Sequence, residues 1–166
     1  MVKYKEGASQ CFINFCMKGA RLLNMFLAVA ATEIERAPLL SLARFQKDRA
    51  VAAVCGVGPV ESAVSTARLL ERYRGTVTGV IAFGIGGAYL ADDGRPAAGL
   101  LDICLAEKEY LGDFGVCFGN RVEQFENENI TAPHEFPLDR AMTERAESLL
   151  AEEGIACIRG NFVTVN

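Results

Sequence analysis

The stretch AVAAVCGVGPVESAVSTARLLERYRGTVTGVIAFGIGG, residues 50–87, decides the fold. Ala50–Cys55 and Thr76–Phe83 are short apolar runs of the length of buried strands. Between them, Val60–Tyr73 carries apolar residues at spacings of three and four, which predicts an amphipathic helix. Glycine-rich turns follow both apolar runs. The pattern is typical of a strand–helix–strand unit with two parallel, buried strands.

The sequence on either side extends this pattern. Phe26–Ala31 predicts another buried strand, and Glu33–Leu42 predicts a helix that Pro38 limits to its first turn or breaks. Further strands and one more helix are expected downstream: Leu100–Ala106, the helix from Asp139 to about Glu153, Ile155–Ile158 and Phe162–Val165, with residues 107–138 rich in loops. We therefore expect an α/β fold with a mainly parallel or mixed central sheet flanked by helices.

Composition narrows the class of protein. The 166 residues are 51% hydrophobic and 23% charged, which excludes a disordered chain and favours one domain with a proper core. The net charge of −4 does not indicate the basic surface that nucleic-acid binding requires. No uncharged run is long enough to span a bilayer. The six cysteines lack metal-ligand spacing and are read as reduced thiols of a cytoplasmic protein.

The first 24 residues differ from the rest. They carry a net charge of +3, against −7 for the remaining 142 residues. One interpretation is a secretory signal, with Leu22–Ala31 as its apolar region and Ala28-Val29-Ala30 as a cleavage-like site. The other, which we favour, is that residues 1–24 are a leader outside the fold, either a mis-annotated start or an unstructured segment, and that residues 25–166 form the domain.

The turns after the strands are candidates for ligand binding, because ligands of such sheets bind at the carboxyl ends of the strands. Gly56-Val57-Gly58 opens a helix, so its N–H groups could face an anion, or it is simply a tight turn. Glu61 stands where a dinucleotide fingerprint needs its third glycine, and no phosphate-binding P-loop is present. The turn Gly84-Ile85-Gly86-Gly87 has room for a sugar or base against its backbone.

Two acids follow the first strand. Glu33 and Glu35 point in opposite directions on a continuing strand, and lie about 200° apart on a helix. At most one of them is therefore expected to face a pocket, and an exposed pair of acids is the simpler alternative. His134 is read as a surface or structural loop residue and Asp102 as a hydrogen-bonding residue at a strand edge.

The order of these motifs resembles the nucleoside phosphorylase/nucleosidase superfamily. The segments that carry the resemblance lie between Phe26 and Asn166: an E-x-E segment after a short strand, VCGVGPVESA, VIAFGIGGAY and LLDI. Within the superfamily, the loop at Gly84–Tyr89 looks like the GIAGAF-type loop of the futalosine hydrolases. The resemblance implies the three-layer nucleoside phosphorylase-like fold.

The resemblance also implies an activity and a site. The activity is hydrolysis of the N-glycosidic bond of a purine nucleoside, futalosine giving hypoxanthine and dehypoxanthine futalosine in menaquinone biosynthesis. Glu35 would activate the water, with Glu33 as the fallback. The residues implied to line the substrate are Ala31, Val57, Ile85, Gly86 and Gly87. The resemblance implies no cofactor or metal, and a homo-oligomer for the full-length form. Alternatives are a methylthioadenosine/S-adenosylhomocysteine nucleosidase and a non-catalytic nucleoside-binding domain.

One departure from the superfamily concerns the end of the sequence. Phe162–Val165 is a strand with no following turn or helix, so the sequence is expected to be cut short. The superfamily's ribose-binding Met-Glu segment and its late Asp, which assists protonation of the base, would lie beyond Asn166. We therefore expect the 166-residue chain by itself to be inactive.

Overall fold

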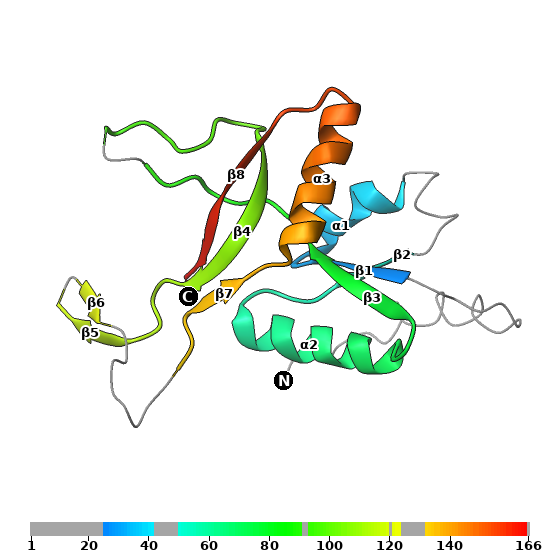
Figure 1. Cartoon of the computed structure of the whole chain (residues 1–166). Helices are drawn as coiled ribbons and strands as arrows, with labels where there is room; N and C mark the ends of the chain where they lie inside the picture. The colour runs from blue at the N-terminus through cyan, green and yellow to red at the C-terminus, as the bar shows by residue number, and fades with distance from the viewer. Residues whose placement is uncertain (1–24, 42–49, 91–92, 120, 124–131, 166) are drawn as a thin grey trace, which may run out of the picture. The chain divides into compact units, whose positions relative to one another are not determined.

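The computed structural model describes residues 25–41, 50–90, 93–119, 121–123 and 132–165. The chain forms two compact units, Met1–Ile85 and Gly86–Asn166. The expected leader 1–24 lies outside the described residues. The first unit holds β1 (Met25–Ala30), α1 (Glu33–Leu40), β2 (Ala50–Val54), α2 (Pro59–Arg72) and β3 (Val77–Ala82). The second holds β4 (Ile103–Leu111), β5 (Val116–Phe118), β6 (Arg121–Glu123), β7 (Glu135–Pro137), α3 (Arg140–Glu152) and β8 (Cys157–Thr164) (Figure 1).

The first unit is built on a parallel sheet, as the apolar runs predict. Its strand order is β2-β1-β3. The central strand β1 is the most buried, and Leu27 is 0% exposed. Leu27, Val29 and Cys55 form the core cluster, and Leu69 of α2 packs against it. Figure 1 shows α1 above and α2 below the three strands in its view. The sequence therefore places its most apolar strand in the middle of the sheet, where both faces are covered.

Helix α1 continues through Pro38, contrary to the prediction that Pro38 limits or breaks it. A proline inside a helix lacks the N–H that would bond to the carbonyl four residues earlier, here that of Ile34. α1 ends at Leu40, two residues later, so little of the helix depends on the missing bond. Arg36 also donates from Nη1 to the carbonyl of Ala52 across 3.4 Å, which ties the helix to β2.

Helix α2 confirms the predicted amphipathic helix, with bounds shifted by one residue. Gly58 is its N-cap with φ of +84°, a conformation that favours glycine, and Pro59 occupies the first helical position. No side chain caps this end of the helix through a hydrogen bond. The turn between β2 and α2 is therefore held by backbone conformation.

The second unit contains a mixed sheet in the order β7-β4-β8, where β4 and β8 are parallel and β7 is antiparallel to β4. β5 and β6 form a separate antiparallel pair. Helix α3 begins after Asp139, whose carboxylate accepts from the N–H of Met142 at 3.0 Å, as predicted for a capping Asp. Together with the first unit, these strands and helices confirm the α/β class.

Two strand predictions in this unit were wrong in their bounds. The strand expected at Leu100–Ala106 begins at Ile103 and runs on to Leu111, through residues expected to be loop. The two short strands expected on either side of Gly160 form one strand, β8. The pairing shifts between Ala106 and Lys108, so the irregularity opposite Gly160 is accommodated without ending the strand.

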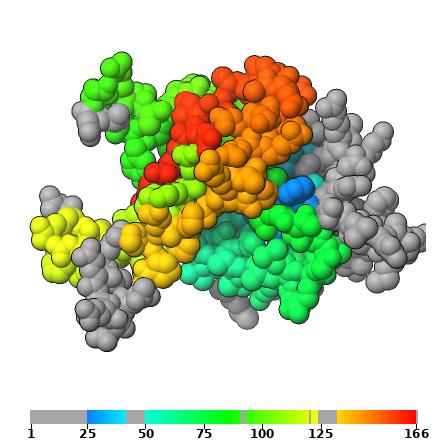
Figure 2. Space-filling model, viewed as in Figure 1, coloured from blue at the N-terminus to red at the C-terminus, as the bar shows by residue number. Residues whose placement is uncertain are grey.

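The segment that precedes β4 is highly exposed. Leu100 and Leu101 are 95% and 91% exposed, and Leu101 has φ of +69°. Figure 2 shows the green residues of this segment projecting from the strands of their unit. Among the described helices, none is long and apolar enough to cross a membrane.

Candidate active site

The carboxyl ends of β1, β2 and β3 lie together at one edge of the parallel sheet. The N–H of Cys55, just after β2, donates to the carbonyl of Ala30 across 2.8 Å. The N–H of Phe83, just after β3, donates to the carbonyl of Val29 across 2.9 Å. These bonds bring the three following turns to the same edge, which is where parallel sheets bind ligands.

Glu35 links two of these turns. It is the third residue of α1, and its Oε2 accepts from both the N–H and the hydroxyl of Thr32, at 2.9 and 2.8 Å. The N–H of Glu35 in turn donates to the hydroxyl of Thr32 at 3.4 Å, which completes a capping box. Its other oxygen, Oε1, accepts from the N–H of Ile85 at 3.0 Å. A single carboxylate thus joins the turn after β1 to the turn after β3.

Gly84 makes room for this carboxylate. A Cβ at this position would lie 2.5 Å from Oε1 of Glu35 and 3.1 Å from its Cδ. Gly84, Gly86 and Gly87 are absent from the glycines with positive φ, so a turn conformation does not explain them. A Cβ at Gly86 or Gly87 would meet no atom of the described residues within 4 Å. The first glycine of the loop therefore serves a close approach, and the next two border open space.

Hydrogen bonds lower the pKa of Glu35. The bond from the Ile85 N–H is the largest cause that lowers the pKa of Glu35 below its ordinary value of 4.5, followed by the bond from the Thr32 hydroxyl. Burial acts in the opposite direction, and the Thr32 N–H lowers the pKa further. The carboxyl group is therefore ionised at neutral pH.

Glu33 faces elsewhere. Arg36 donates to both of its carboxylate oxygens, from Nε and Nη2 at 3.0 Å each, and the Glu33 side chain is 62% exposed. Two positions apart on a helix, the two acids point in different directions, and only Glu35 meets the turn after β3.

The other site residues expected from the sequence are placed as follows. Ala31 follows β1 and is half-buried, whereas Val57 and Ile85 are 69% and 85% exposed in their turns. Gly86 and Gly87 begin the second unit and follow Ile85 directly in the chain. The first unit thus brings Ala31, Glu35, Val57 and Ile85 to the three turns at the end of its sheet.

The first glycine of the turn Gly56-Val57-Gly58 lies beside the carboxylate of Glu61. Gly56 has φ of +92°, and a Cβ there would lie 2.5 Å from Cδ and 2.9 Å from Oε1 of Glu61. Glu61 is in the first turn of α2, where an acid is stabilised by the positive end of the helix. The carboxylate of Glu61 therefore lies against Gly56, and Gly56 leaves room for it.

Sequence reasoning missed the contacts that Thr32 and Gly84 make with Glu35, although Gly84 was part of a candidate binding loop. The Thr-x-x-Glu pattern of residues 32–35 is a capping-box signature and was a readable signal for Thr32.

Cys55 is a buried thiol, as expected from the sequence. Its Sγ donates to the carbonyl of Ala30 at 3.3 Å and accepts from the hydroxyl of Ser62 at 3.3 Å. These contacts hold the end of β2 against β1.

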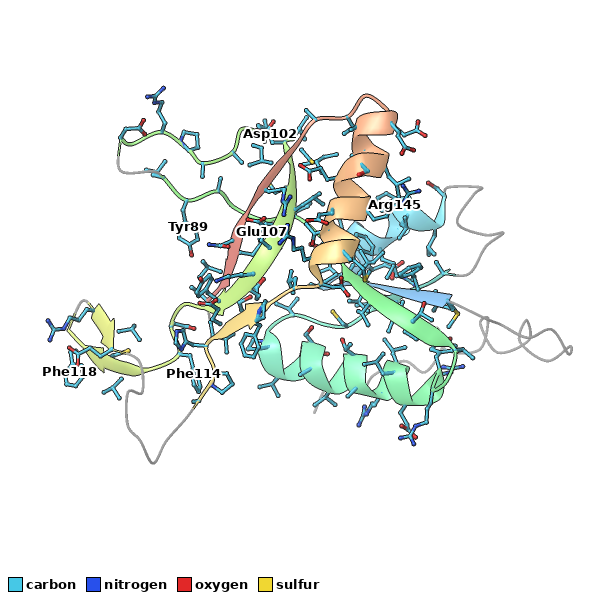
Figure 3. All side chains as sticks on the ribbon, in the orientation of Figure 1. Tyr89, Asp102, Glu107, Phe114, Phe118 and Arg145 are labelled. Atoms are coloured by element: carbon cyan, nitrogen blue, oxygen red, sulfur yellow. The ribbon has the colours of Figure 1, made fainter. Side chains whose placement is uncertain are left out.

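Two other residues considered from the sequence lie in the second unit. Asp102, labelled in Figure 3, lies just before β4, and its Oδ2 accepts from the N–H of Gly99 at 2.7 Å, which makes it a turn residue. His134 precedes β7, and its carbonyl accepts from the N–H of Leu111 at 2.9 Å. Within the part of the chain that the structure describes, no group of three or more His, Cys, Asp or Glu side chains could hold a metal ion.

Parallel strands that end in glycine-rich turns, with one ionised carboxylate between them, define the class of α/β proteins that bind small molecules at the end of a sheet. The sequence profile of the Phosphorylase superfamily matches residues 8–166, and the chain belongs to this superfamily. No curated protein sequence matches the chain.

Solved structures of nucleosidases share the fold. Futalosine hydrolase of Helicobacter pylori strain 26695 superposes with a TM-score of 0.67 at 15% identity, over 86% of this chain and 67% of that one. The 5'-methylthioadenosine/S-adenosylhomocysteine nucleosidase of H. pylori, with butyl-thio-DADMe-Immucillin-A, gives 0.67 at 16% identity, over 86% and 65%. A mutant of H. pylori MTAN with 5'-methylthioadenosine in its active site superposes with a TM-score of 0.66 at 16% identity. The match covers 85% of this chain and 64% of that one.

The likeness at these identities is one of fold, and it confirms the nucleoside phosphorylase-like architecture. The chain spans about two thirds of the length of these structures, 64–67%.

Proposed function

We propose that the chain contributes the water-activating part of a nucleosidase that hydrolyses the N-glycosidic bond of a purine nucleoside, with futalosine as the substrate. The observation that carries the proposal is the carboxylate of Glu35, held between Thr32 and Ile85 at the carboxyl edge of the parallel sheet. Ala31 and Val57 would line the ribosyl side. Ile85, Gly86 and Gly87 would form the wall beside ribose and purine.

The chemistry requires a base on the water and a proton on the purine. As the bond between the ribose and the purine nitrogen breaks, the ribosyl ring gains oxocarbenium character. The water oxygen then bonds to the anomeric carbon, and Glu35 takes the water's proton. The departing purine takes its bonding electron pair and must gain a proton. Glu35 is ionised at neutral pH, so it is able to accept the water's proton, as the role of base requires.

Hydrolysis is favoured over phosphorolysis by Glu61. Its carboxylate lies against Gly56 in the turn between β2 and α2, and a phosphate entering that turn would meet a like charge. The nucleosidases among the similar structures support the same choice. We therefore expect the reaction to be independent of phosphate.

A second candidate substrate is methylthioadenosine or S-adenosylhomocysteine. The observation in its favour is that the methylthioadenosine nucleosidase superposes as well as futalosine hydrolase does, with a TM-score of 0.67 for both. A non-catalytic nucleoside-binding domain is the remaining alternative. With futalosine as substrate, the protein would act in menaquinone biosynthesis in the cytoplasm. We also propose that it forms a homo-oligomer.

The test is a single-turnover assay with the purified chain in excess over futalosine or 5'-methylthioadenosine. We expect release of hypoxanthine from futalosine above the uncatalysed rate, far below the ~1–10³ s⁻¹ typical of enzymes, and unchanged by added phosphate. Adenine release from 5'-methylthioadenosine instead would establish the second candidate. Calorimetry with hypoxanthine and adenine measures binding directly. Binding of either base without any hydrolysis would establish the non-catalytic nucleoside-binding domain. Turnover of futalosine at a typical enzyme rate would contradict the proposal that the chain supplies only the water-activating part of the site.

A further inference from the structure

Thr32 gives Glu35 two hydrogen bonds on the same oxygen. Its hydroxyl and its N–H both donate to Oε2, at 2.8 and 2.9 Å. The hydroxyl also accepts from the N–H of Glu35 at 3.4 Å, the longest of the three contacts. The two shorter bonds are therefore those made to the carboxylate: the one from the Thr32 N–H belongs to the capping box, and the one from the hydroxyl is additional to it.

These bonds leave the two carboxylate oxygens unequal. Each oxygen of an ionised carboxylate offers about two acceptor positions. Within the described residues, Oε2 has both positions filled by Thr32, and Oε1 has one filled by the N–H of Ile85. One acceptor position remains, on Oε1, beside the turn after β3.

We propose that Thr32 is the positioning residue of Glu35: it occupies Oε2 and thereby directs the remaining acceptor position of Oε1 to the attacking water. This inference rests on the proposed role of Glu35 as the base. It adds the reacting atom, Oε1, and the residue that selects it. The lowered pKa of Glu35, to which Thr32 contributes through its hydroxyl and its N–H, agrees with this arrangement.

Helix α3 shows that capping alone does not require this arrangement. Asp139 caps α3 through one carboxylate oxygen, which accepts from the N–H of Met142 at 3.0 Å. The third residue of α3 is Met142, so this cap orients no carboxylate. Asp139 is therefore a matched control, in which the cap can be removed without touching Glu35.

The experiment titrates the Glu35 carboxyl carbon by NMR in the full chain and in three Thr32 variants. Thr32→Ser keeps the hydroxyl, Thr32→Val removes it, and Thr32→Asp keeps a good helix cap but replaces the donor with a negative charge. We expect the pKa of Glu35 to rise in Thr32→Val and Thr32→Asp, and Thr32→Ser to retain the low pKa. Asp139→Ala is expected to lower the Tm without moving the pKa of Glu35.

A second readout is the single-turnover hydrolysis of futalosine. We expect Thr32→Asp to slow it by about tenfold, the rate equivalent of one hydrogen bond to a charged group. Thr32→Ser is expected to rescue most of that loss. If Thr32→Val and Thr32→Asp leave the pKa of Glu35 at the wild-type value, the positioning role is overturned, even where Glu35→Gln abolishes hydrolysis. If Glu35→Gln hydrolyses at the wild-type rate, the proposed function fails and the water-directing role fails with it, whatever the titration shows.

Discussion

The backbone N–H of Ile85 donates to Oε1 of Glu35 across 3.0 Å, although the two residues are 50 positions apart in the sequence. The bond connects the first turn of α1 to the turn that follows β3. It also contributes most to lowering the pKa of Glu35. One hydrogen bond therefore both links two turns at the end of the sheet and favours the ionised form of the carboxylate.

Glu35→Gln is expected to slow the single-turnover hydrolysis of futalosine by about a hundredfold or more, because an amide cannot accept the water's proton. Glu33→Gln is the matched control, since Glu33 lies in the same helical turn but pairs with Arg36, and its side chain is 62% exposed. We expect it to retain the wild-type rate. Equal losses in both variants, measured as hypoxanthine released, would contradict the assignment of the base to Glu35.

Gly84→Ala is expected to displace the Glu35 carboxylate, because the new Cβ would lie 2.5 Å from Oε1. The side chain of Glu35 is flexible, so it moves away and loses the bond from Ile85. We expect the free energy of unfolding to fall by about 1 kcal/mol, and the pKa of Glu35 to rise towards its ordinary value. Urea unfolding and NMR titration measure the two effects.

The control for Gly84→Ala is Gly86→Ala, where the Cβ would meet no described atom within 4 Å. We expect Gly86→Ala to change the free energy of unfolding by no more than about 0.5 kcal/mol. If Gly84→Ala and Gly86→Ala have the same free energy of unfolding and the same pKa of Glu35, the role of Gly84 is refuted.

The first unit was largely predictable from sequence because its signals are local. The apolar run of β1, the stripe of α2 and the glycine-rich turns all depend on neighbouring residues. β4 was cut short because its second half is charged, and charged residues do not indicate a strand by themselves. Partners on neighbouring strands stabilise them: Arg159 on β8 pairs with Glu107, and Glu135 on β7 pairs with Lys108.

The candidate site also has a part that the sequence predicts and a part that it does not. The glycine-rich loops and the pair of acids were visible as motifs, and so was the capping signature of residues 32–35, although it was not used. The approach of Glu35 to Gly84 and Ile85 was not visible, since it depends on the pairing of β1 with β3. Only the pairing register brings these two turns within hydrogen-bond distance.

Leu27→Ala is expected to destabilise the first unit strongly. Leu27 is 0% exposed at the centre of the core cluster, and truncation of a buried leucine costs about 2–5 kcal/mol. Leu100→Ala is the matched control, because Leu100 is 95% exposed, and a change within about 0.5 kcal/mol is expected. Urea unfolding monitored by circular dichroism measures both. A similar small change in both variants would contradict the assignment of the core to β1.

The contribution of Glu35 to stability is expected to depend on pH in a direction fixed by its pKa. The pKa in the folded chain is lowered from 4.5, so the unfolded chain binds a proton at this group more readily than the folded chain does. The stabilisation is therefore fully present above about pH 4.5, and is lost as the pH falls through the lower folded pKa. The measurement is the difference in the free energy of unfolding between wild type and Glu35→Gln, from urea unfolding at a series of pH values. This difference should be constant near neutral pH and shrink on the acid side.

The control is Glu33→Gln, which keeps Glu35 and its three donors. This variant should lose stability on the acid side as the wild type does. A difference that grows as the pH falls would show that Glu35 is protonated more easily in the folded chain. It would contradict the lowering of the Glu35 pKa by the hydrogen bonds from Thr32 and Ile85.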